Sequence, residues 1–124
     1  MSNPNPQQCA GAERLIFACS GAADVGAISD RAVRQLTQTG RGKMFCLAGV
    51  GGHIQGIVDK TKAATYILAI DGCSLDCAQK TLEQAGCTKF RHLRVTDLGM
   101  EKGKAPVTDQ AIQTVVSAAE TLLA

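Results

Sequence analysis

Short apolar segments alternate along this chain with segments whose apolar residues recur at helical spacing. The apolar segments are bounded by turn residues, which is typical of buried parallel strands. They lie near residues 14–19, 43–48, 65–71 and 90–95. Strand alternating with helix predicts an α/β fold: a single three-layer domain with a mostly parallel sheet of about four strands and helices on both faces.

Four helices are expected, because apolar residues share one helical face and capping residues stand at the ends. The first should end at Gly40, and the last should begin after Thr108. The third should cover about residues 75–85, from an N-cap at Ser74 to a stop at Gly86. The apolar positions of the first, second and last helices are Val25, Ile28, Ala32, Val33 and Leu36; Ile54, Ile57 and Val58; and Ile112, Val115, Val116, Ala119, Leu122 and Leu123.

Composition narrows the classes of function. The chain has 124 residues, a net charge of +2, one Tyr and no Trp, so it lacks the charge and stacking pattern of a nucleic-acid-binding protein. No apolar run approaches a membrane span, and the polar N-terminal residues do not resemble a signal peptide. We therefore expect a cytoplasmic protein, in which six cysteines favour metal or redox chemistry over disulfides.

Four of the cysteines are expected at one edge of the sheet. Cys19, Cys46 and Cys73 follow three of the predicted strands, and the carboxyl ends of parallel strands share one edge, where ligands bind. Strands about 4.8 Å apart are compatible with the separation of just under about 4 Å between sulfurs around zinc. Cys77 lies four residues after Cys73, across the first turn of the predicted helix, where the helix dipole favours thiolates. These four residues are the predicted ligands of one Zn²⁺ per chain.

Two other uses of the same cysteines remain open. A thiol enzyme for sulfur transfer or redox exchange would use Cys73 or Cys19 as its nucleophile. An iron–sulfur cluster would also suit four thiolates. The spacing contains no CxxC pair, and single free cysteines are often simply buried. Cys9 and Cys87 are expected to be incidental thiols.

Several polar residues near the predicted edge have less specific roles. Asp71 is expected to shape a turn, although it could also orient a loop, contact a ligand or act as a base. Asp24 and Asp97 are similar but weaker candidates, and His53 is expected at the surface or as a cap rather than as a ligand. His92 is given no role.

Three segments outside the helices and strands are expected to form a tail, a turn and a loop. Residues 1–12 are expected to form a flexible tail, so that residues 13–124 make up the domain. Residues 49–52 are expected to form a glycine-rich turn, whose amides could approach a thiolate site together with those of Gly21 and Gly72. The polar segment 96–107 is long for so small a domain and is expected to cover the site.

The motifs at these positions resemble the DGC-domain family, for which zinc binding by four cysteines is proposed. The resemblance spans about residues 14–124 and is carried by Cys19-Ser-Gly21, Asp24-Val-Gly26, Cys46-Leu-Ala-Gly49-Val-Gly51, Asp71-Gly72-Cys73-Ser-Leu-Asp-Cys77-Ala78, Leu82-Glu83-Gln-Ala-Gly86 and Val95-Thr-Asp-Leu-Gly99-Met-Glu-Lys-Gly103. It implies that Cys19, Cys46, Cys73 and Cys77 bind zinc, and it implies no reaction or substrate. The expected function is zinc binding in metal handling or sensing, with no indicated protein partner.

Overall fold

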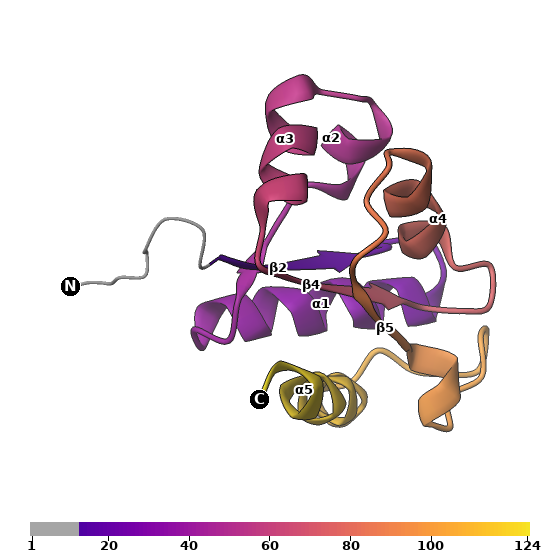
Figure 1. The fold of residues 1–124 in the computed structure, drawn as a ribbon. Coiled ribbons are helices and arrows are strands. Elements are labelled where there is room, and N and C mark those ends of the chain that lie inside the picture. Colours follow the sequence, from indigo (N-terminus) through magenta and orange to yellow (C-terminus); the bar gives the residue numbers. More distant parts are fainter. Residues whose placement is uncertain (1–12) are drawn as a thin grey trace.

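The computed structural model describes residues 13–124, which form an α/β fold around a parallel sheet (Figure 1). The predicted tail and Cys9 lie outside the described residues. Within them the sheet has four strands in the order β3-β2-β4-β5. These strands are β2 (Arg14–Ala18), β3 (Lys43–Met44), β4 (Tyr66–Asp71) and β5 (Arg91–Arg94). The predicted fold class is confirmed, although β3 is only two residues long.

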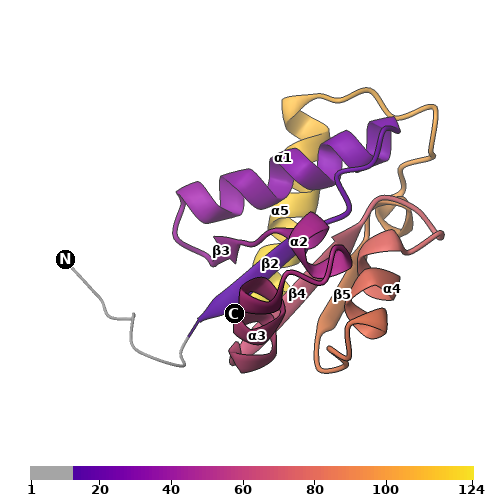
Figure 2. The same ribbon diagram turned by 90° about the horizontal axis from the view of Figure 1, so that it is seen from above.

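Helices cover both faces of this sheet. On one face lie α1 (Asp24–Gln38) and α5 (Asp109–Leu123), and on the other lie α2 (Leu47–Gly51), α3 (Gln55–Ala63) and α4 (Cys77–Gln84). A short 3₁₀ helix, η1 (Val95–Leu98), follows β5. Figure 2 looks onto the sheet from the side of α2, α3 and α4 and shows the strands lying next to one another.

The alternation of side chains along the central strands divides the core in two. In β2, Ile16 packs with α1 and α5, whereas Leu15 and Phe17 pack on the opposite face. In β4, Leu68 and Ile70 belong to the α1–α5 side. Each strand is therefore buried on both faces, which is why the two read as continuous apolar runs.

The longest helices agree with the sequence pattern. The last helix is capped as predicted, because the Thr108 hydroxyl accepts a hydrogen bond from the Ala111 amide at 3.1 Å. Gly40 follows the end of α1 in the left-handed conformation (φ +78°), which favours glycine. None of the described helices has the combination of length and apolar character needed to cross a membrane.

Two predictions about the shorter helices are wrong. Residues 49–52 are not simply a turn, because Gly49 and Gly51 belong to α2. The third predicted helix does not begin near Leu75: α4 begins at Cys77. Its N-cap is Asp76 rather than Ser74, and Asp76 adopts a left-handed backbone conformation (φ 54°) that delays the first helical turn.

Candidate metal centre

A cavity of about 830 Å³ opens among the segments that follow β2 and β3 and the first turns of α4. Cys19, Cys46 and Cys77 all contribute to its lining. Cys19 directly follows β2, Cys46 precedes α2, and Cys77 is the first residue of α4. The structure thus brings three of the four predicted ligands, from three separate segments, to one cavity.

Cys73 is placed differently. It is partly buried and packs against the apolar cluster on the α1–α5 side, and it is not part of the cavity lining. In residues 13–124, no three cysteine sulfurs all lie within 4.8 Å of one another. The set of four ligands therefore stays a prediction, and Cys73 is the member that the geometry supports least.

Backbone amides point at two of the cavity sulfurs. The Gly49 amide donates to Cys46 Sγ at 3.3 Å, and the Gly72 amide donates to Cys19 Sγ at 3.4 Å. Ser29 Oγ lies 3.5 Å from Cys19 Sγ. Sulfur is a ligand type that zinc prefers, but the three cavity sulfurs do not all lie within 4.8 Å of one another, so a shared ion would require them to move closer together.

An ion pair forms another part of the cavity wall. Arg34 donates to Asp30 at 2.8 Å and Ser20 donates to the same carboxylate at 2.7 Å. The hydrogen bond from Arg34, assisted by the one from Ser20, lowers the pKa of Asp30. Asp30 is therefore ionised, and the Arg34 guanidinium beside it offsets the charge of this carboxylate at the cavity wall.

Asp71, the last residue of β4, caps the start of α4. Its carboxylate is 1% exposed. One oxygen accepts from the Ala78 amide at 2.7 Å, and the other accepts from the Gln79 amide at 3.1 Å. Asp71 thus does more than shape a turn, because it satisfies two amides that a helix start leaves without partners.

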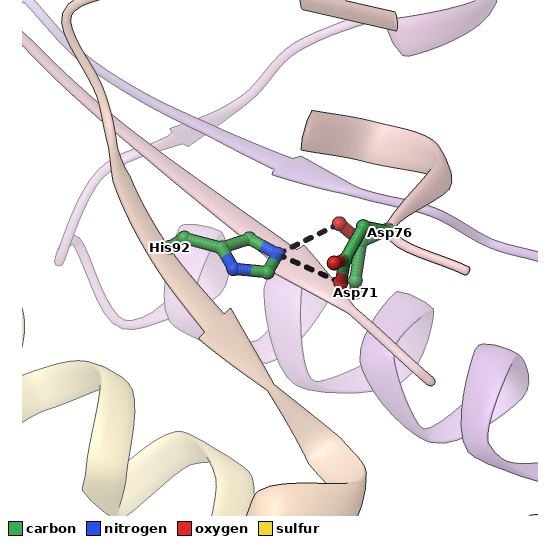
Figure 3. Close-up of side chains that lie close together, drawn as sticks. All are labelled: Asp71, Asp76 and His92. Atoms are coloured by element: carbon green, nitrogen blue, oxygen red, sulfur yellow. Dashed lines mark hydrogen bonds and ion pairs between the residues drawn. The ribbon is translucent and has the colours of Figure 1, made fainter. Parts of the chain in front are cut away.

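Two side chains of β5 complete this polar group (Figure 3). His92 Nε2 lies 2.8 Å from an Asp71 oxygen and 3.5 Å from an Asp76 oxygen, so the nitrogen donates its proton to a carboxylate. Arg94 binds both oxygens of Asp76, at 3.0 and 2.7 Å. The Arg94 hydrogen bond holds the pKa of Asp76 below its ordinary value.

Asp71, Asp76 and His92 offer ligand atoms that all lie within 4.8 Å of one another. A divalent ion at this point would compete with partners that are already present. Two amides and His92 occupy the Asp71 oxygens, and the Arg94 guanidinium occupies those of Asp76. The group is best explained as an internally satisfied polar network.

We expected no role for His92, although the sequence around it shows the alternation that places its side chain beside that of Arg94. Residues 92 and 94 alternate with Leu93, so their side chains share one face of β5. The parallel register pairs Asp71 with Arg94. That register places both β5 side chains beside the end of β4, which sequence alone did not define.

Asp24 and the segment 96–107 form a contact away from the cavity. The Asp24 carboxylate accepts from the amides of Gly103 at 2.9 Å and Ala105 at 3.0 Å, and these bonds lower its pKa. The segment is therefore tied to the start of α1. None of its residues lines the cavity, so the expectation that it covers the cysteine site is wrong for this cavity.

The remaining candidates lie apart from the cavity lining. His53 is exposed between α2 and α3, with a left-handed backbone (φ 58°). Asp97 pairs with Arg94 at 3.5 Å. Cys87 is buried on the α4 side of the sheet, where burial raises its pKa, as suits a packed thiol with no ligand role.

A parallel α/β domain with cysteines gathered at the carboxyl edge of its sheet is thus a candidate thiolate metal protein. The chain belongs to the DGC-domain family, whose model matches residues 15–119. It is also similar to the anaerobic and virulence modulator AnvM of Pseudomonas aeruginosa. The two are 32% identical over 88 residues, which cover 71% of this chain and 67% of AnvM. No solved structure matches the chain.

Proposed function

We propose that this protein binds one zinc ion per chain through cysteine thiolates in the cavity, and that it serves in metal handling or sensing in the cytoplasm. The observation that carries the proposal is the convergence of Cys19, Cys46 and Cys77 on one cavity. Amide hydrogen bonds to two of these sulfurs provide further support. Zinc bound there would supply a Lewis-acidic centre of fixed charge.

The part played by Cys73 decides what kind of site this is. Four protein thiolates would make a closed site, of the kind that is structural or used for storage. Three thiolates would leave one coordination position for water or another ligand. Because Cys73 does not line the cavity, the Cys73→Ser variant distinguishes these forms. Unchanged zinc affinity in this variant supports three ligands from Cys19, Cys46 and Cys77, whereas a loss as large as that expected for these three cysteines supports four ligands.

Metal analysis of protein purified without oxygen is the direct test. We expect about one zinc per chain. In competition with a chromogenic chelator, Cys19→Ser, Cys46→Ser and Cys77→Ser should each weaken zinc binding by more than about 100-fold. Cys87→Ala is the matched control, because it removes a thiol that is buried elsewhere, and it should leave affinity unchanged. A metal-free protein that also fails to take up added zinc would refute the proposal.

The other thiol chemistries give different results in the same preparation. A brown protein with visible absorbance would indicate an iron–sulfur cluster. A thiol enzyme would show one cysteine that is alkylated much faster than the rest in metal-free protein. Cys73 precedes α4 by four residues and so lacks the predicted position at a helix start. The amides of the first turn of α4 already bind Asp71.

The similarity to AnvM bears on the biological role. AnvM is named an anaerobic and virulence modulator, and a regulatory role for this chain would agree with metal sensing. Growth of a deletion strain at limiting and excess zinc would test this role. Separation of cytoplasmic and membrane fractions would test the location.

A further inference from the structure

The start of α4 is not stabilised by its own N-cap. The helix is eight residues long, and the side chain of its N-cap, Asp76, makes no capping hydrogen bond. The Asp76 carboxylate instead binds Arg94 through both oxygens. Asp76 also has a left-handed backbone, which Asp adopts more readily than most residues other than glycine, and the ion pair with Arg94 helps to hold it there.

The amides of the first turn receive their acceptor from another element. Asp71, at the end of β4, accepts from Ala78 and Gln79. His92 donates to the Asp71 oxygen that also accepts from Gln79. A buried carboxylate needs hydrogen-bond partners for its oxygens, so His92 helps to orient the group that caps α4.

Cys77 lies between the two residues that these contacts fix. Asp76 before it is held by Arg94, and Ala78 after it is held by Asp71. The Cys77 side chain is exposed on the cavity, so packing does little to fix its place. The backbone on either side must therefore determine where its sulfur lies.

We propose that His92 and Arg94 are positioning residues of the cysteine site: through Asp71 and Asp76 they fix the first turn of α4 and so place the Cys77 sulfur on the cavity. This inference rests on the proposed zinc-binding function. It assigns a role to β5, which contributes no cysteine of its own. Groups that support metal ligands typically change affinity by about 10–100-fold when they are removed.

Substitutions of His92 provide the main test. His92→Leu removes the donor to Asp71, whereas His92→Gln keeps an N–H group that can replace Nε2. In metal-free protein, His92→Leu should raise hydrogen exchange at the Ala78 and Gln79 amides by about tenfold or more, corresponding to about 1.4 kcal/mol of lost local protection. The same variant should weaken zinc binding by about 10–100-fold, measured by chelator competition. His92→Gln should recover most of both losses.

Arg94 can be tested in the same way. Arg94→Met should weaken zinc binding, and Arg94→Lys should recover only part of the affinity, because an ammonium group lacks the two-pronged geometry of guanidinium. Val115→Ala on α5 is the control for lost stability, because Val115 is buried on the opposite face of the sheet. It should lower the free energy of unfolding without changing zinc affinity.

The two proposals fail in different ways. If wild-type protein binds no zinc, the proposed function is wrong, and exchange at Ala78 and Gln79 still reports whether His92 orders the start of α4. If wild-type protein binds zinc and His92→Leu binds it within twofold of wild type, the positioning role is refuted. A loss of one of two bound zinc ions in His92→Leu would also refute it, because His92 would then be a metal ligand.

Discussion

The two faces of the sheet are covered in different ways. On one face, α1 and α5 are each 15 residues long, and the buried cluster to which they contribute has 16 residues. On the other face, α2, α3 and α4 have five, nine and eight residues, and the buried cluster has eight. Two of the cavity cysteines lie on the second side, where Cys46 precedes α2 and Cys77 begins α4. From the first side, α1 contributes Asp30 and Arg34 to the cavity wall. The comparison separates a face that supplies stability from a face that presents chemistry.

The helices on the two faces also begin in different ways. The cap of α5 is local, since Thr108 binds an amide three residues ahead. The start of α2 uses a candidate ligand, because Cys46 Sγ accepts from Gly49, and the start of α4 uses a carboxylate from β4. Changes that loosen α2 or α4 should therefore alter both folding and metal binding, whereas changes within the buried cluster of α1 and α5 should alter folding alone.

The largest effect is expected for Leu36→Ala on α1. Leu36 is fully buried on the long-helix face, and removing most of such a side chain typically lowers the free energy of unfolding by about 2–5 kcal/mol. Denaturant titration measures this loss. Zinc affinity of the folded protein should be unchanged. A loss of zinc affinity together with the loss of stability would show that the two faces are not independent.

Leu82→Ala on α4 sharpens the comparison, because Leu82 is just as buried. We expect a destabilisation near the lower end of the same range, about 2 kcal/mol, since the smaller cluster around Leu82 can relax into the space. Zinc affinity should fall as well, because a looser α4 carries Cys77 with it. Chelator competition under conditions where both variants are folded measures this difference. Equal affinities for Leu36→Ala and Leu82→Ala would contradict it.

Thr108→Ala should have a smaller effect. Loss of an N-cap hydroxyl costs about 0.5–2 kcal/mol, and the hydroxyl of Thr108 caps only α5. Thermal unfolding should shift to lower temperature. Thr108→Ser keeps the hydroxyl and should behave like the wild type. A change in zinc stoichiometry in Thr108→Ala would show that α5 influences the cavity.

The smallest effect is expected for Asp24→Asn and should appear in acid. The Gly103 and Ala105 amides lower the pKa of Asp24 below its ordinary value of 3.8. Its stabilising contribution is therefore complete above that value and is lost as the pH falls through the lower pKa of the folded state. Asp24→Asn should reduce the decline in stability over that acidic interval. An unchanged pH profile, measured by thermal unfolding from pH 6 to pH 2, would argue against this role.

The sequence predicted the α1–α5 side better than the cavity side, for physical reasons. Long helices repeat their apolar pattern over several turns, so α1 and α5 could be recognised. In α2 the pattern was hidden by Gly49 and Gly51, which are poor helix formers. The start of α4 depends on the left-handed Asp76 and on a carboxylate from β4, and neither feature has a local sequence signal.

The sequence also predicted the candidate site only in part. Placing cysteines at strand ends was sufficient to bring Cys19 and Cys46 to one cavity, together with Cys77. The direction of Cys73 depends on the path of the chain between β4 and α4. The role of His92 depends on the register between β4 and β5. Long-range pairing of this kind follows from the assembled sheet, which a pattern along one strand does not describe.

The position of β5 has one more consequence, for self-association. Within residues 13–124 it is an edge strand, and in that part of the chain no strand pairs with its outer side, so a strand from another molecule could pair there. Its sequence, Arg91-His92-Leu93-Arg94, places charged and polar side chains along that edge, and such side chains discourage the addition of strands. Replacing His92 and Arg94 together with apolar residues would therefore make aggregation through the sheet edge more favourable, even if zinc binding were preserved by other means.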